Sequence, residues 1–284
     1  MIKIGPAGNS KSFYDQGHSA TVEAPEWLFL RGLNAFEYSF GRGVNMSPEN
    51  AGLICQKAKQ FDIVLSVHAP YYTNFCNPDD EKINKSIGYV QKSLETAIWL
   101  GAKRVVVHPG SLTKQSRIEA AKNAKKNIAL LDEVLSGEFA EYRDGRIEIA
   151  IETLGKSAQI GTVDEVLDFV APFKAMTACI DFGHVNSITN GSLKSKDDFK
   201  KVIDKVYGTL GDERAKRLHI HFSKIMYGKM GEIKHLTFED TEFGPNYEFL
   251  AEIINEYKMT PTLICESDGT MAEDAIQFKK WLKL

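Results

Sequence analysis

The chain has 284 residues, of which 43% are hydrophobic and 26% charged, as expected for a globular protein with a sizeable core. Its 35 basic and 38 acidic side chains give a net charge of −3, which excludes a uniformly cationic surface that binds nucleic acid by charge alone. No window reaches the roughly 18 apolar residues of a membrane span, and no basic segment with a long apolar run opens the chain, so we expect neither membrane insertion nor secretion.

Short apolar runs, often β-branched, recur along the chain and predict strands. There are eight of them, at residues 2–4, 35–39, 63–67, 104–107, 147–151, 177–180, 217–222 and 261–265. Successive runs begin about 30 to 45 residues apart, which leaves room for one strand, one helix and two loops. This spacing is typical of parallel βα units.

Helix signals lie between the strands. Ser47 followed by Pro48 is a cap and first helical residue, and Thr162 with Glu165 forms a capping box. A last amphipathic helix is expected at residues 271–281. We therefore predict an α/β fold: a single (β/α)₈ barrel domain spanning residues 1–284, with an open doubly wound sheet as the alternative.

Histidines collect near the predicted strand ends. Six of the seven do so: His68, His108, His184, His219, His221 and His235, the last in the loop after the seventh strand. Three carboxylates follow the same rule: Glu152, Asp181 and Glu266. In an α/β barrel the C-terminal strand ends meet around one cavity that carries the active site. A lone histidine at a strand end is more often structural. Because several strands end in histidine or a carboxylate, the pattern indicates a site for divalent metal ions, with zinc as the first choice and manganese as the second.

At these positions the chain resembles the endonuclease IV family of zinc-dependent apurinic/apyrimidinic endonucleases, within the xylose-isomerase-like barrel superfamily. The most specific segments are residues 66–71, 107–111, 151–155 and 179–184. The resemblance implies three zinc ions, of which this chain would hold two or three. It implies eight ligands: His68, His108, Glu152, Asp181, His184, His219, His235 and Glu266. The family's Asp-x-His pair is absent, and Glu232 is the expected substitute for the aspartate.

Two positions stay open. His219 and His221 face the same side of one strand, because side chains alternate with period two. The register with Lys224 favours His219 as the ligand and leaves His221, nearer the mouth, as a substrate contact. The segment at residues 5–9 also departs from the family's histidine-containing opening.

The resemblance further implies a phosphodiesterase that cuts duplex DNA on the 5′ side of abasic sites in base excision repair. Glu152 would bridge metals and orient the attacking water, and Arg42 and Tyr71 would contact DNA. The alternative is a sugar isomerase or epimerase with one ion held by Glu152, Asp181, His219 or His221, and Glu266. That alternative leaves four histidines unused, which favours the nuclease over it. A metal-binding module without activity is a third possibility.

Cysteine usage bears on location. Cys55, Cys76, Cys179 and Cys265 form no CxxC pair, and two of them lie in buried-looking strands. Reduced thiols and a cytoplasmic location are expected, and a monomer is the expected state.

Overall fold

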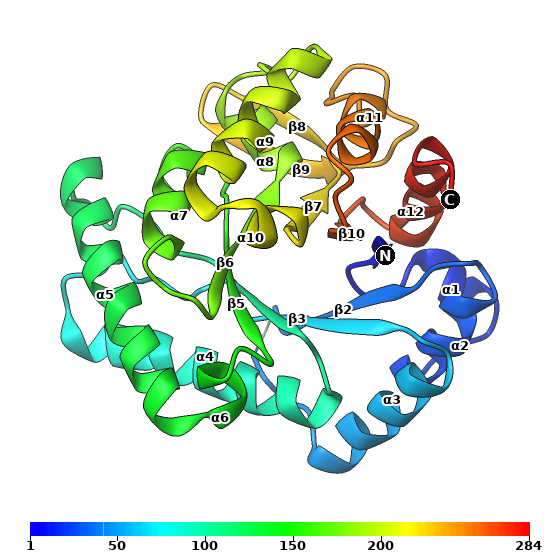
Figure 1. Ribbon diagram of the computed structural model, residues 1–284, viewed down its shortest axis with the longest axis horizontal. Helices are drawn as coiled ribbons and strands as arrows, with labels where there is room; N and C mark the ends of the chain where they lie inside the picture. The colour runs from blue at the N-terminus through cyan, green and yellow to red at the C-terminus, as the bar shows by residue number, and fades with distance from the viewer. Residues whose placement is uncertain (42) are drawn as a thin grey trace.

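The computed structural model describes residues 1–41 and 43–284. Eight parallel strands form one sheet in the order β1, β10, β7, β6, β5, β4, β3, β2, and Figure 1 shows them around a central axis with the helices outside. Their bounds are β1 Lys3–Pro6, β2 Ala35–Ser39, β3 Val64–His68, β4 Arg104–Val107, β5 Glu148–Glu152, β6 Met176–Asp181, β7 His219–Phe222 and β10 Thr262–Cys265. All eight predicted strands are present, so the barrel is confirmed.

The barrel closes between β1 and β2. There the backbone of Gly8 donates to the carbonyl of Glu37 at 2.9 Å, and Ala7 forms a parallel bridge with Glu37. Asn34 adds its side-chain oxygen, which accepts from the backbone of Ile4 at 2.7 Å. A Cβ on Gly5 would lie only 1.7 Å from the carbonyl oxygen of Ala35, so glycine is required for this close approach. These contacts exclude the open sheet.

Helices cover the outside of the barrel. They are α1 Lys11–Asp15, α2 Ala24–Phe29, α3 Pro48–Gln60, α4 Asp80–Leu100, α5 Arg117–Glu138, α6 Ala140–Arg143, α7 Val163–Val170, α8 Phe182–Ile188, α9 Lys196–Leu210, α10 Asp212–Lys216, α11 Glu248–Glu256 and α12 Met271–Trp281. Both predicted caps are confirmed: Ser47 accepts from the backbone of Asn50, and Thr162 and Glu165 form the capping box. The last predicted helix coincides with α12.

A two-stranded hairpin was not predicted. Strands β8 (Lys224–Gly228) and β9 (Gly231–Leu236) pair antiparallel after β7, so His235 lies on a strand and the expected loop is wrong. The burial of β9 is irregular, with Ile233 and Lys234 exposed, so its sequence carries no clear alternation. The hairpin packs against α8, next to the C-terminal end of the barrel.

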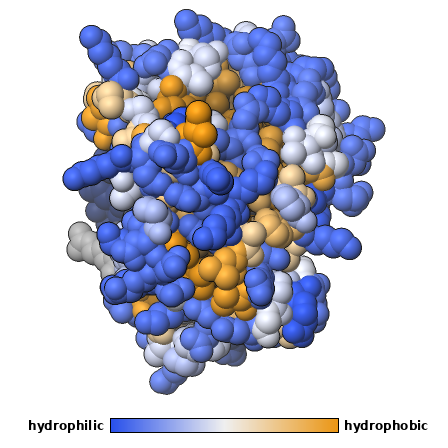
Figure 2. Space-filling model, turned by 90° about the vertical axis from the view of Figure 1, so that its left-hand side faces the viewer, coloured by the Kyte–Doolittle hydropathy of each residue, from blue (hydrophilic) through white to orange (hydrophobic). Residues whose placement is uncertain are grey.

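Polar residues fill much of the barrel interior. Glu37, Ser66, His219 and His221 are buried there, whereas the main apolar core includes residues of the strands and of the helices packed around them. Figure 2 shows one outer face, on which hydrophilic residues predominate and hydrophobic ones form small patches. Among the described residues no helix has the length and apolar character to span a membrane, and the four cysteines are free thiols.

Candidate metal centre

Three groups of side chains at the C-terminal end of the barrel could each hold a metal ion. Cluster 1 is His68, His108 and Glu152; cluster 2 is Glu152, Asp181, His221 and Glu266; cluster 3 is His184, Glu232 and His235. Within each cluster the potential ligand atoms lie within 4.8 Å of one another. Members of all three line one cavity of about 480 Å³. The structure thus brings together all but one of the nine expected ligands, and His221 stands in place of the other, His219.

Glu152, the last residue of β5, connects clusters 1 and 2. One carboxylate oxygen, Oε2, lies 3.1 Å from Nε2 of His68 and 2.9 Å from Nε2 of His108. The other oxygen, Oε1, lies 3.0 Å from Nδ1 of His221. The side chain is 1% exposed, so its two oxygens face two different groups of nitrogen donors with almost no water. A carboxylate in this position is suited to bridge two cations.

Three histidines of clusters 1 and 3 are oriented through one ring nitrogen. Nδ1 of His68 donates to the carbonyl of Ala69 at 2.7 Å, and Nδ1 of His184 donates to the carbonyl of Thr153 at 3.0 Å. Nδ1 of His235 lies 2.9 Å from the hydroxyl of Ser223. In each case Nε2 is left facing a carboxylate of its own cluster. Such bonds fix the tautomer that ligates a metal.

Asp181 supplies an independent indication that cluster 2 suits a cation. Its Oδ1 accepts from the backbone of His184 at 2.8 Å, capping α8. Its Oδ2 is buried, makes no hydrogen bond among the described residues, and has Nδ1 of His184 as a neighbour at 3.3 Å. Burial raises the pKa of Asp181 to about 6. A buried carboxylate oxygen without a hydrogen bond is costly unless a cation neutralises it, so the donor set fits a divalent ion.

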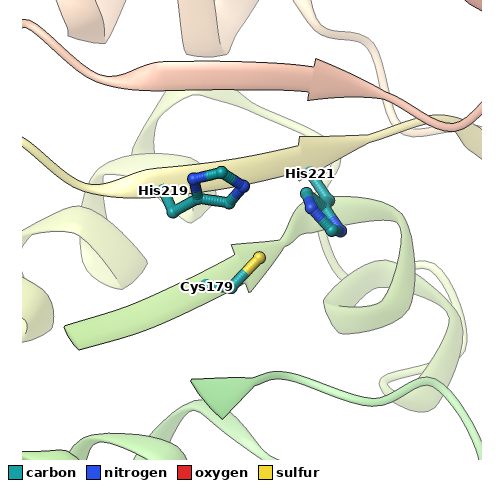
Figure 3. Close-up of side chains that lie close together, drawn as sticks. All are labelled: Cys179, His219 and His221. Carbon is teal, nitrogen blue, oxygen red and sulfur yellow. The ribbon is translucent and has the colours of Figure 1, made fainter. Parts of the chain in front are cut away.

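His221, and not His219, lies among these carboxylates. Figure 3 shows both rings on the same side of β7, with His221 nearer the C-terminal end and Cys179 of β6 beside them. Two residues along a strand span roughly 6.6 Å, and this distance puts His219 one layer deeper. Nδ1 of His221 is 3.5 Å from Glu266. The sequence favoured His219 as the ligand and His221 as the substrate contact, whereas this geometry favours His221 as the ligand.

Glu37 of β2 is a site residue that the sequence analysis missed. Its Oε1 lies 3.0 Å from Nε2 of His221, its Oε2 accepts from Nε2 of His219 at 3.0 Å, and Ser66 donates to it at 2.7 Å. Burial opposes ionisation, but His221 and His219 hold the pKa of Glu37 well below its usual range. Glu37 thus turns Nδ1 of His221 toward cluster 2. An acid flanked by apolar residues in mid-strand was the available signal.

Glu232 lies where the family's aspartate was expected. Its Oε2 is 3.4 Å from Nε2 of His184, and its Oε1 is 3.8 Å from Nε2 of His235. Residues three apart on a regular strand face opposite sides. Here Met226 pairs with Lys234 and Tyr227 with Glu232, so Ile233 is bulged out of register. The bulge absorbs the extra residue and lets Glu232 and His235 share one face.

The cavity rim holds the remaining candidates. Tyr71 is half exposed, its ring lies 4.8 Å from that of His68, and its hydroxyl bonds to Ser39 at 2.8 Å. Ala7, from the segment that departs from the family pattern, lines the cavity, as does Lys156. Lys156 lies 3.6 Å from Glu232 and is 48% exposed. Arg42 lies outside the described residues.

Comparison with known proteins identifies the class of barrel. The chain belongs to the family described as xylose isomerase-like TIM barrel, which matches residues 28–283. It is 33% identical to an uncharacterised protein of Methanocaldococcus jannaschii over 94% of this chain and 92% of that protein. It is 30% identical to a probable endonuclease 4 of Staphylococcus epidermidis, over 58% of this chain and 53% of that protein. The chain thus spans about half the length of that relative.

Solved structures share the fold. Endonuclease IV from Thermus thermophilus superposes with a TM-score of 0.63 and 20% identity, covering 93% of this chain and 94% of that one. A D-tagatose 3-epimerase-like protein gives a TM-score of 0.66 and 20% identity, covering 88% of this chain and 87% of that one. The family is enzymatic and its relatives include a probable endonuclease 4, whereas the epimerase-like protein shares the fold.

Proposed function

We propose that the protein is a zinc-dependent endonuclease that cuts duplex DNA on the 5′ side of abasic sites. The observation that carries this proposal is the position of Glu152, whose two oxygens face two separate ligand clusters beside a third. A centre with several ions suits a phosphodiester, because both the attacking and the leaving oxygen need stabilisation. Endonuclease 4 relatives support the choice.

Charge favours the same substrate class. The three clusters contain four carboxylates: Glu152, Asp181, Glu232 and Glu266. Three divalent ions would exceed these four negative charges and leave a positive centre that attracts a phosphate group. The imidazole and carboxylate donors suit zinc, and manganese is the second choice. Lys156 adds a flexible cation at the rim that can contact a phosphate oxygen.

The roles of the chain's own residues follow from the contacts. Divalent ions held by the three clusters would supply a water of lowered pKa and positive charge for the phosphate oxygens. Glu152 holds the two inner clusters together and is placed to accept a proton from the attacking water. Tyr71 presents an exposed ring beside His68 at the rim, where it can pack against the sugar next to an abasic gap. An abasic nucleotide is also cheaper to extrude than a paired base.

A sugar epimerase is the second candidate, because cluster 2 alone has the composition of a one-ion site. Glu152 and Glu266 would then act as the two bases next to a carbonyl. Clusters 1 and 3 would have no purpose in that reaction. Epimerase-like structures share the fold, which supports only the architecture.

The test is an oligonucleotide duplex with one abasic site, end-labelled on the damaged strand and incubated with metal-replete protein. We expect a nick 5′ to the lesion that leaves a 3′ hydroxyl, loss of activity after prolonged chelation, and steep inhibition by salt. The undamaged duplex of the same sequence is the control. Intact abasic duplex at low salt, together with conversion of a ketose, would transfer the assignment to the epimerase. Metal analysis also distinguishes the two functions: we expect about three equivalents of metal for the nuclease and about one for the epimerase.

A further inference from the structure

A second polar cavity lies at the opposite end of the barrel. It has a volume of about 440 Å³ and is lined by the first residues of several strands, among them Val64 of β3, Arg104 of β4, Glu148 of β5 and His219 of β7. It shares no residue with the cavity of the metal centre. We call it the N-terminal pocket.

The N-terminal pocket has an excess of positive charge. Its lining includes four basic side chains and one acid: Lys103, Arg104, Arg146, Arg217 and Glu148. Glu148 forms ion pairs with two of these arginines: its carboxylate lies 3.0 Å from Nε of Arg104 and 3.6 Å from Nη1 of Arg217. Arg146 reaches the acids Glu141 and Asp144, which do not line the pocket, at 3.4 and 3.6 Å. Lys103 has no ion-pair partner in the part of the chain that the structure describes.

Two buried polar side chains, Arg104 and His219, line the N-terminal pocket in fixed positions. The Arg104 side chain is 9% exposed and also donates to the carbonyl of Arg217, so its guanidinium is fixed. His219 is fully buried, and its Nδ1 has no hydrogen-bond partner within residues 1–41 and 43–284. Nε2 of His219 donates to Glu37, so Nδ1 is left as an acceptor. Figure 3 shows the two ring nitrogens directed toward opposite ends of β7.

We propose that the N-terminal pocket binds a small phosphate anion, free or as the monoester of a small molecule. Lys103, Arg146 and Arg217 surround the charged oxygens, with Arg104 fixed at the wall. The protonated oxygen of hydrogenphosphate donates to Nδ1 of His219, which no side chain of the described protein satisfies. Arginine forks and ammonium groups are the usual partners of phosphate. The site is independent of the proposed nuclease activity.

Methyl NMR of the metal-loaded protein tests the proposal with inorganic phosphate as the probe. Val64 and Leu65 line the N-terminal pocket, whereas Leu154 lines the metal cavity and reports phosphate bound there. We expect saturable shifts of the Val64 and Leu65 methyls. The double variant Lys103→Gln with Arg217→Gln should weaken this binding roughly tenfold or more while the Leu154 response is retained.

A matched control removes the same charge elsewhere. Lys85→Gln with Lys125→Gln changes two exposed lysines of α4 and α5 and should titrate like the unmodified protein. Sulfate has no proton to donate at neutral pH and should bind several-fold more weakly than phosphate. Shifts confined to Leu154, or equal shifts of Val64 and Leu65 in the pocket variant and its control, overturn the site. Sulfate binding as tight as phosphate overturns the His219 contact on which the proposal rests.

Discussion

Clusters 1 and 2 are built differently from cluster 3. His68, Glu152 and Asp181 are the last residues of β3, β5 and β6, and each is buried. Cluster 3 takes Glu232 and His235 from the β8–β9 hairpin, with side chains 13% and 25% exposed. The closed sheet therefore determines where the first two clusters lie, whereas the third also depends on how a hairpin outside the barrel packs.

The hairpin is held against the loop after β5 by backbone contacts. Glu232 donates its backbone N–H to the carbonyl of Gly155 at 2.8 Å, and Ser157 donates to the carbonyl of Met230 at 3.0 Å. Lys156 and Gly231 also form an antiparallel bridge. Because these bonds are few, we expect cluster 3 to lose its ion before the other two.

The largest effect is expected for Glu152→Gln. The amide keeps the shape of the carboxylate but neither bridges two cations well nor accepts a proton, so nicking should fall by about a thousandfold or more. Metal content should fall less than after loss of a histidine. Initial rates on the abasic duplex and metal analysis provide the measurement. Activity near that of the unmodified protein would remove Glu152 from the mechanism.

Replacing each histidine of β7 tests which layer binds metal. His221→Ala should remove about one metal equivalent and reduce nicking at least a hundredfold, because cluster 2 loses its only nitrogen donor. His219→Ala should keep the full metal content. Its nicking rate should fall roughly tenfold, because Glu37 loses its bond to His219 and orients His221 less well. Circular dichroism confirms that both variants fold. Equal metal loss in the two variants would contradict the separation into layers.

Glu232→Gln tests whether the hairpin cluster is separate from the barrel clusters. We expect loss of about one equivalent and roughly tenfold to a hundredfold lower nicking, with clusters 1 and 2 still occupied. Glu232→Asp at the same position is the conservative control for charge. If all metal is lost together, the three clusters bind as one unit and the contrast drawn above is wrong.

Gly231→Ala changes the hairpin without touching a ligand. Gly231 has a φ of +89°, and a Cβ there would lie 2.0 Å from the carbonyl oxygen of Gly155. We expect about 1–3 kcal/mol of destabilisation, concentrated in the hairpin. Hydrogen exchange of β8 and β9 amides and the affinity of the third ion should report it, with Gly137→Ala, where a Cβ meets open space, as control. Unchanged exchange would show that the close approach is unimportant.

The smallest effect is expected for Tyr71→Phe. The variant loses the 2.8 Å bond to Ser39, about 1 kcal/mol, but keeps the ring beside His68 and His108. Nicking should fall only a few-fold, mainly through a higher KM. Tyr71→Ala should cost more, because the ring itself is lost. Equal rates for the two variants would remove the ring from substrate binding.

Sequence reasoning succeeded where a residue's place follows from its own strand. The eight apolar runs and the histidines and acids that end them are local signals, and the structure brings these side chains together as expected. The sequence could not separate His219 from His221, because alternation fixes the face of a strand but not the depth within the barrel. Glu37 was missed because its partners lie on β3 and β7, far along the chain.

The β8–β9 hairpin was not predicted, for a different reason. The pairing of Met226 with Lys234 and Tyr227 with Glu232 leaves Ile233 as an extra residue. A bulge breaks the period of two that identifies a strand, so the pattern of β9 resembles a loop. The same bulge explains why Glu232 stands three residues before His235 and still faces it.

The position of β1, between β10 and β2 in the closed barrel, bears on the order of folding. Lys3 of β1 pairs with Thr262 of β10, so β1 has no neighbour on that side until β10 has been synthesised. The strands from β2 to β7 can assemble earlier as an open sheet with two exposed edges. Cluster 2 takes Glu266 from the end of β10, so an ion bound there recognises the closed barrel alone. Metal binding would then stabilise the closed barrel relative to the open sheet.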